Sequence, residues 1–251
     1  MHMNFDDYLA ALQSDTLLLA AAASEAGADA PVVTCPGWTV RDLVLHIGEV
    51  QRWCGSMVRN RVTNPSKHTE DFLGVLPNDT ALVDWFVDGS AKLVATLKAA
   101  DVDVECFTFL EDAGTPRDFW ARRQANEIAI HRVDAESALG RNSGIPALHA
   151  SDGIDELLMG FAPRSRTPLR SAVPMVLQVA PFDSDSAWRV RITDQPAVTT
   201  RKFGDADCSV SGSSSDVYQS LWNRQGSENL TVSGDASVLE LFRENVQIRW
   251  G

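Results

Sequence analysis

Large apolar side chains recur at roughly helical spacing in residues 4–26, 40–60 and 80–100, which predicts three helices. A fourth helix is expected at residues 116–139 from the N-cap and proline at its start and from Gly140 at its end. Residues 61–79 are rich in turn formers, and residues 101–109 are interpreted as either a short strand or an extended link. The pattern predicts four antiparallel helices.

Two of these helices carry clear start signals. Thr39 stands where an N-cap hydroxyl belongs, and Asp42, three residues later, completes a capping-box pattern. Thr115 and Pro116 give the fourth helix an N-cap and a proline at its first position. The second and fourth helices are therefore expected to begin sharply at about residues 40 and 116.

The pattern changes after the turn-rich stretch from Gly140 to Pro146, where alternation typical of strands begins. Strands are expected at 175–179, 188–192, 197–200, 208–211 and 230–232, and helices at 151–162, 216–224 and 236–245. The chain is thus predicted to be a two-domain α+β protein. Residues 1–142 form a four-helix bundle, and residues 150–251 form a small α+β domain with a mostly antiparallel sheet.

Charge and composition narrow the classes of partner. The 251 residues include 22 Lys and Arg against 34 Asp and Glu, a net charge of −12, which disfavours nucleic acid and anionic membrane surfaces. The longest apolar run, residues 17–23, is far shorter than the roughly 20 residues of a membrane span, and we recognise no signal peptide. The four cysteines are widely spaced, so we expect reduced thiols in a cytoplasmic protein. The protein is expected to be either a monomer or a homodimer.

Candidate metal ligands stand on the fourth predicted helix. Glu127 and His131 are four residues apart, so a helix stacks them on one face and can aim both at one point. Gln124 and Asp134 share this polar face, where a purely structural helix would carry Leu or Ile. A third candidate, His46, lies on the second predicted helix. Together the three form a His-Glu-His set with room for a bound thiol or water.

These residues also have ordinary structural interpretations. A single histidine such as His46 is commonly a core-edge residue bonded to a carbonyl, and a polar row with Glu127 and His131 is also what a solvated helix face shows. Asp42 and Glu49 stand at helical spacing from His46. Either of them would be placed to orient its second ring nitrogen, the support that metal-bound histidines usually receive.

Other residues of ligand or nucleophile type are assigned structural roles. His68 lies in the turn-rich interval without a neighbour at ligand spacing, and we interpret it as a surface residue. Cys54 is offset from His46 around the helix and is interpreted as a small buried hydrophobe. Cys35 precedes Pro36 and is given a structural role, so no cysteine of the chain is required for catalysis.

Two motifs resemble those of a known family. The first is Thr-Cys-Pro-Gly-Trp-Thr-Val-Arg-Asp-Leu-Val-Leu-His at 34–46, and the second is Asn-Glu-Ile-Ala-Ile-His-Arg-Val-Asp-Ala-Glu at 126–136. Both are similar to motifs of the mycothiol-dependent maleylpyruvate isomerase family, and the ending from Val232 to Phe242 resembles its final segment. The resemblance covers essentially the whole chain. It implies a DinB-like metal-binding four-helix bundle followed by a small α+β domain.

The resemblance also implies site residues and cofactors. His46, Glu127 and His131 match the zinc ligands of the family, and mycothiol would be the thiol cosubstrate. A family arginine that helps to bind substrate or cofactor falls at Arg224, although the family more often has glycine where this chain has Asn223. The expected function is that of a zinc- and mycothiol-dependent enzyme. It is either an isomerase of the maleylpyruvate type or a thiol S-transferase acting on small electrophiles or unsaturated acids.

Three functional hypotheses stay open at this point. In the first, a thiol loses its proton at the open zinc position and acts as nucleophile, while Arg224 holds a substrate carboxylate or an enolate. In the second, the two histidines and one carboxylate form the triad of an iron(II) oxygenase. In the third, the protein is not an enzyme but a metal-dependent small-ligand binding or regulatory protein.

Overall fold

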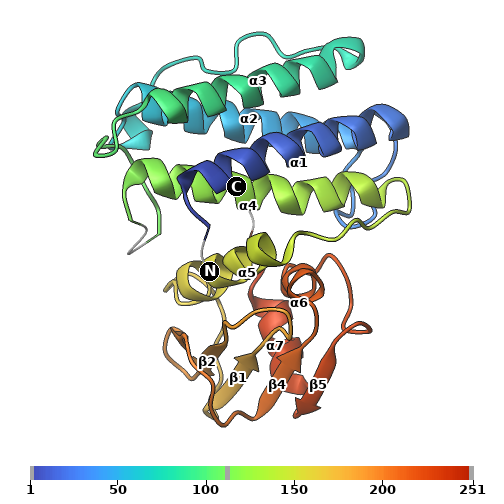
Figure 1. The fold of residues 1–251 in the computed structure, drawn as a ribbon, viewed down its shortest axis with the longest axis vertical. Helices are drawn as coiled ribbons and strands as arrows, with labels where there is room; N and C mark the ends of the chain where they lie inside the picture. Colours follow the sequence, from blue (N-terminus) through green and yellow to red (C-terminus); the bar gives the residue numbers. More distant parts are fainter. Residues whose placement is uncertain (1–2, 111–113, 249–251) are drawn as a thin grey trace. The chain divides into compact units, whose positions relative to one another are not determined.

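The structure, a computed structural model, describes residues 3–110 and 114–248. The chain divides into two compact units, of which one is Asn4–Ser143. The described part of Gly144–Gly251 forms the other unit together with Met3. The first of these units is helical, and the second contains the sheet (Figure 1).

Four long helices build the helical unit. They are α1 (Phe5–Ala26), α2 (Val40–Arg59), α3 (Asp79–Ala99) and α4 (Pro116–Ser137), with a short 3₁₀ turn, η1 (Pro65–Lys67), in the loop after α2. The main packing partners are α1 with α4 and α2 with α3 (Figure 1). All four predicted helices are present, with ends that agree to within two residues. Residues 101–109 are an extended link and not a strand.

The predicted start signals operate as local hydrogen bonds. Thr39 and Asp42 form the reciprocal capping box of α2, and the Thr115 hydroxyl accepts a hydrogen bond from the Asp118 N–H at the start of α4. These bonds satisfy backbone N–H groups that a helix leaves without an intrahelical acceptor. The two helices that carry the candidate ligands therefore begin at positions determined by nearby residues.

The sheet unit has the element order that the alternation predicted. Its helices are α5 (Ala147–Asp155), continued by the π-helical turn η2 (Glu156–Phe161), α6 (Ser214–Leu221) and α7 (Ser237–Asn245). Its strands are β1 (Met175–Val179), β2 (Trp188–Ile192), β3 (Val198–Thr200), β4 (Cys208–Ser211) and β5 (Thr231–Gly234). The first helix begins earlier than expected, at Ala147, and the other ends agree with the prediction to within three residues.

The five strands form one sheet in the order β3-β2-β1-β4-β5. Three of the four neighbouring pairs are antiparallel, and β1 and β4 are parallel, with Leu177 opposite Cys208. The prediction of an α+β protein with a mostly antiparallel sheet is confirmed. Among the described helices none combines the length and the apolar character that a membrane span needs.

A buried ion cluster joins α1 to α4. The Arg132 Nε lies 2.8 Å from Oδ1 of Asp15, and its Nη1 donates to Oε1 of Glu136 at 2.8 Å. All three side chains are at most 7% exposed. Burial raises the pKa of Asp15 from 3.8 to about 6, against the opposing effect of the Arg132 charge and hydrogen bond. The charged form of Asp15 is thus less favourable in the folded protein than in the unfolded chain.

This cluster predicts a pH dependence of stability. Between about pH 4 and pH 6 the folded state keeps a proton on Asp15 that the unfolded chain has lost, so the free energy of unfolding falls as pH rises through this window. The titration of Asp15 lowers the free energy of unfolding by about 3 kcal/mol in total across this window. The test is urea denaturation of wild type and Asp15→Asn at pH 4.5 and pH 7. We expect the wild type to be less stable relative to the variant at pH 7 than at pH 4.5.

Asp84→Asn is the matched control, because Asp84 is an exposed carboxylate of the same unit. Its stability difference from wild type should be the same at both pH values. A pH-independent difference for Asp15→Asn would show that Asp15 titrates as an ordinary exposed acid.

Candidate metal centre

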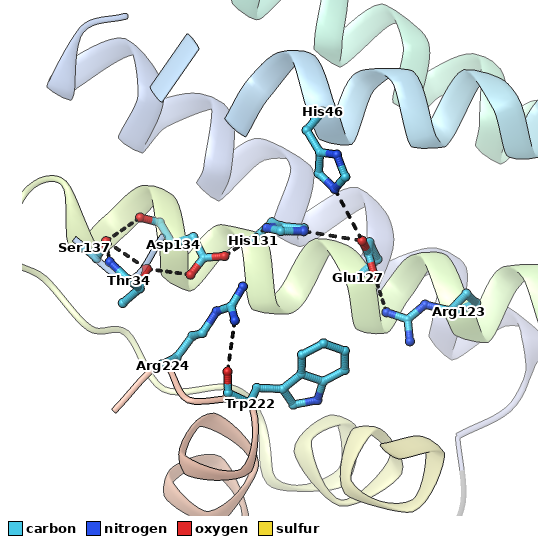
Figure 2. Close-up of polar contacts among 9 residues, drawn as sticks. All are labelled: Thr34, His46, Arg123, Glu127, His131, Asp134, Ser137, Trp222 and Arg224. Atoms are coloured by element: carbon cyan, nitrogen blue, oxygen red, sulfur yellow. Dashed lines mark hydrogen bonds and ion pairs between the residues drawn. The ribbon is translucent and has the colours of Figure 1, made fainter. Parts of the chain in front are cut away.

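The structure brings His46, Glu127 and His131 together between α2 and α4. One ligand atom of each residue lies within 4.8 Å of the other two. The distance from Glu127 Oε1 to His131 Nε2 is 3.4 Å, and the distance from the same oxygen to His46 Nε2 is 3.9 Å. Figure 2 shows His46 pointing from α2 toward the Glu127 carboxylate, and the His131 ring on α4 pointing toward the same carboxylate.

The polar face of α4 is not a solvated face. Glu127 is 4% exposed and His131 is 8% exposed, while the His46 side chain keeps 21% of its surface open. Buried ionisable groups normally have a partner, because an unpaired charge in the interior is costly. Yet Glu127 Oε1 has no hydrogen-bond partner among the described residues. The cluster thus contains a buried acceptor that a cation would satisfy.

The three ligand atoms fit a small divalent metal. Zinc binds imidazole nitrogen and carboxylate oxygen at about 2.0–2.2 Å, which places tetrahedral ligands about 3.3–3.5 Å apart. The separation of 3.4 Å between Glu127 and His131 matches this value, and His46 would need to approach by a few tenths of an ångström. Two nitrogens and one oxygen suit zinc, and they suit iron(II) as well. Three ligands leave a coordination position for water or a thiol.

Hydrogen bonds hold both α4 ligands in place (Figure 2). Arg123, one turn before Glu127, donates from Nη2 to Oε2 at 2.5 Å and so leaves Oε1 for the cluster. Nδ1 of His131 lies 2.9 Å from Oδ2 of Asp134, and Thr34 donates to the other Asp134 oxygen at 2.6 Å. A carboxylate on one ring nitrogen directs the other toward a metal. The i, i+4 spacing of Arg123 and Glu127 is readable in the sequence, whereas the contribution of Thr34 is not.

His46 has a different kind of support. The Asp42 carboxylate accepts from the Thr39 backbone at 2.8 Å and from its hydroxyl at 2.7 Å, so it caps α2. The expectation that Asp42 orients His46 is wrong, and no hydrogen bond or ion pair joins Glu49 to His46 within the described residues. Trp38 contacts His46 edge to face at 5.1 Å between ring centres and stacks parallel to His131 at 6.5 Å. These contacts of Trp38 with the two imidazoles were not predicted from the sequence.

The protonation of the cluster follows from its neighbours. Burial would raise the pKa of Glu127, but the Arg123 charge and the two imidazoles hold it well below its ordinary value. Burial lowers the pKa of His131, but the hydrogen bonds and charges of Asp134 and Glu127 outweigh it and raise the pKa from 6.5 to about 9. Glu127 is therefore an anion in the cluster, and a metal ion and a proton would compete for His131 Nε2.

The other ligand-type residues of this unit lie outside the cluster. Cys54 is fully buried, as predicted. Its burial, and to a smaller extent the nearby Cys106, raise its pKa well above the ordinary value. His68 is not the partnerless surface residue that we expected. Its side chain is 10% exposed, and Nε2 lies 2.6 Å from the Ser56 hydroxyl and 3.5 Å from Glu70. This contact was not predicted from the sequence, because it forms only when the loop after α2 folds back onto that helix.

Arg224 lies in the sheet unit, in the turn after α6. Its backbone N–H donates to the Gln219 carbonyl, and its guanidinium donates to the Trp222 carbonyl at 2.9 Å. The preceding Asn223 has φ +59°, a left-handed conformation that glycine and asparagine adopt most readily. Asn223 is anchored there by two hydrogen bonds with Arg243. The replacement of glycine by Asn223 is thus compatible with the same turn.

Comparisons with known proteins place this architecture. The family model for the mycothiol maleylpyruvate isomerase N-terminal domain matches residues 9–136, and the MDMPI C-terminal domain matches residues 149–241. A crystal structure of a mycothiol-dependent maleylpyruvate isomerase is similar, with a TM-score of 0.61 and 17% identity. A histidine-to-alanine mutant of a mycothiol-dependent maleylpyruvate isomerase has a TM-score of 0.62 and the same identity. Both alignments cover 92% of this chain and 93% of the other.

The fold and the cluster define an α+β protein that combines a helical unit, with convergent histidines and a glutamate, and a small mixed-sheet unit. The chain belongs to the mycothiol maleylpyruvate isomerase family, because the first of the two family models alone spans half of it. The family resemblance seen in the sequence is confirmed. No curated protein matches the chain.

The cluster predicts zinc binding that depends unequally on its ligands. We expect wild type to bind about one zinc per chain and the double variant His46→Ala, His131→Ala to bind none. Loss of His131 alone should weaken binding about 100-fold or more, since a zinc site shares about 10–16 kcal/mol among its ligands. Loss of His46 should cost less, because His46 lacks the carboxylate support of His131. Competition titration against a chromophoric chelator measures both affinities.

His68→Ala is the control, because it also removes a partly buried histidine of the helical unit. This variant should bind zinc like wild type. Unchanged zinc content in the double variant would end the hypothesis of a metal centre at this cluster.

Proposed function

We propose that this protein is a metal- and thiol-dependent enzyme, an isomerase of the maleylpyruvate type or an S-transferase, that uses zinc and mycothiol. The observation that carries the proposal is the convergence of His46, Glu127 and His131, with an unsatisfied Glu127 oxygen, in a chain of this family. Mycothiol is the proposed thiol because the family and the similar crystal structures are named for dependence on it.

The roles of the chain's own residues follow from the cluster. His46, Glu127 and His131 would hold zinc, and the metal would supply an open position at which a thiol is deprotonated near neutral pH. Arg123 keeps Glu127 ionised and turned toward the cluster, and Asp134 would accept the Nδ1 proton of His131, so that Nε2 offers its lone pair to the metal. Trp38 covers one side of both imidazoles and limits how a bound molecule can approach.

The proposed reaction is conjugate addition. A carbon–sulfur bond forms between the thiolate and an activated double bond, and the electron pair of that double bond moves to the carbonyl oxygen as an enolate. Rotation about the new single bond and expulsion of the thiolate restore the double bond in the other configuration. If the adduct is protonated at carbon instead, the product is a thioether and the protein acts as an S-transferase.

Arg224 is the proposed anion-binding residue of this reaction. A guanidinium binds a carboxylate through charge-assisted hydrogen bonds and stabilises the negative charge of an enolate. The assignment rests on the family resemblance and on a local turn in which the guanidinium donates to the Trp222 carbonyl at 2.9 Å.

Thiol-dependent turnover is the direct test. Zinc-loaded protein is incubated with maleylpyruvate and with a panel of small electrophiles, in the presence of mycothiol or of glutathione. We expect conversion that requires both zinc and mycothiol, with glutathione much less effective. Activity only in anaerobically iron-loaded protein with oxygen would favour the oxygenase hypothesis. Tight binding of a panel compound without turnover would favour a metal-dependent ligand-binding protein.

The role of Arg224 predicts a separate kinetic effect. Arg224→Ala should raise KM for a carboxylate substrate about 10- to 100-fold, because a charge-assisted hydrogen bond contributes about 1.5–3 kcal/mol. Zinc content should stay at the wild-type value. Arg201→Ala is the control, because Arg201 is a half-exposed arginine of the same unit that pairs with Asp155. Equal kinetic constants for Arg224→Ala and wild type would remove Arg224 from the site.

A further inference from the structure

The hydroxyl of Thr34 reaches the metal centre through a residue 100 positions away in the sequence. Thr34 Oγ1 donates to Asp134 Oδ1 at 2.6 Å, and Asp134 Oδ2 lies 2.9 Å from His131 Nδ1 (Figure 2). Asp134 is completely buried. We propose that Thr34 is a positioning residue of the metal centre, which acts through Asp134 to fix the orientation and tautomer of His131. The proposal rests on metal binding by the cluster, as proposed above.

The direction of the Thr34–Asp134 hydrogen bond follows from the chemistry of the two groups. A carboxylate oxygen only accepts, and a hydroxyl has one proton to donate, so Thr34 donates to Asp134 Oδ1. Ser137 donates its own proton to the Asp134 backbone carbonyl at 2.7 Å. The Ser137 oxygen, 3.2 Å from the Thr34 oxygen, faces the Thr34 backbone N–H at 3.4 Å. Ser137 thus ties the loop to α4 without a hydrogen bond to the carboxylate.

Thr34 is held in a well-braced loop before α2, which we call the 31–39 loop. A backbone bridge joins Pro31 to Thr39, the Val32 N–H donates to the Trp38 carbonyl at 2.9 Å, and the Trp38 N–H donates to the Cys35 carbonyl at 3.0 Å. The same loop presents the Trp38 ring to His46 and His131. The loop therefore touches both ligand helices at the cluster.

The consequence for His131 is a single usable orientation. An ionised carboxylate can only accept, so Nδ1 carries the proton and Nε2 offers its lone pair to a metal. The terminal torsion of an aspartate is broad, so hydrogen bonds decide how its carboxylate is turned. Thr34 donates to Oδ1 and thereby favours the orientation in which Oδ2 faces the imidazole. Outer hydrogen bonds of this kind typically change metal affinity 10- to 100-fold.

The test compares three variants of the full chain. Thr34→Val removes the hydroxyl at nearly constant shape, Thr34→Ser keeps the hydroxyl, and Ser137→Ala removes the other link between the 31–39 loop and α4. Zinc affinity is measured by chelator competition, and the d–d absorption of the Co²⁺-loaded protein reports ligand geometry. We expect Thr34→Val to bind zinc about tenfold more weakly with an altered Co²⁺ spectrum. Thr34→Ser and Ser137→Ala should keep both properties.

The control variants separate positioning from loop anchoring. If Ser137→Ala weakens zinc binding as much as Thr34→Val, or if Thr34→Val leaves affinity and spectrum unchanged, the inference is overturned. A wild-type protein that binds neither zinc nor Co²⁺ would instead refute the metal centre itself. If Thr34→Val does not fold, Asp134→Asn replaces it, and the same loss of affinity is expected from weakened support of His131.

Discussion

A carboxylate in a protein interior needs compensating positive charge, and this requirement organises the helical unit around α4. Glu127 is one of six charged or imidazole side chains that α4 buries between Arg123 and Glu136. Arg123 neutralises one of its oxygens, while the other lies 3.4 and 3.9 Å from two histidine nitrogens and has no hydrogen-bond partner among the described residues. A structural ion pair would satisfy both oxygens. The unfinished pairing is what distinguishes this cluster from the Asp15–Arg132–Glu136 cluster, in which neighbouring charges lie within 2.8 Å.

The two halves of the candidate centre are held with different firmness. Glu127 and His131 come from one helix, and each has a charged neighbour that orients it. His46 comes from another helix, is more exposed, and contacts Trp38 through its ring edge. Because His46 is less restrained than Glu127 and His131, its distance from a metal ion in the cluster can change at a low cost in energy. Such an arrangement suits chemistry in which a fourth ligand enters and leaves.

The cysteines bear on the source of the nucleophile. A thiol binds a metal or attacks an electrophile as the thiolate, and burial in apolar surroundings disfavours the thiolate. Cys54, on the same helix as His46, is fully buried, and burial raises the pKa of its thiol well above 9.0. Burial raises the pKa of Cys106 and Cys208 as well. Burial therefore keeps three of the protein's thiols protonated. This agrees with a nucleophile that is supplied by a small thiol cosubstrate.

The sequence by itself determined the elements, because helical periodicity, the Thr39 and Thr115 caps and strand alternation are local signals that act within a few residues. It also proposed His46, Glu127 and His131, since the i, i+4 spacing of the latter two is a local geometry. Only the tertiary structure decided that these residues are buried and convergent, that Asp42 does not orient His46, and that His68 has partners. Thr34 and Trp38 became visible in the same way. Their contacts join segments up to 100 residues apart, and packing brings such segments together in a way that no periodicity encodes.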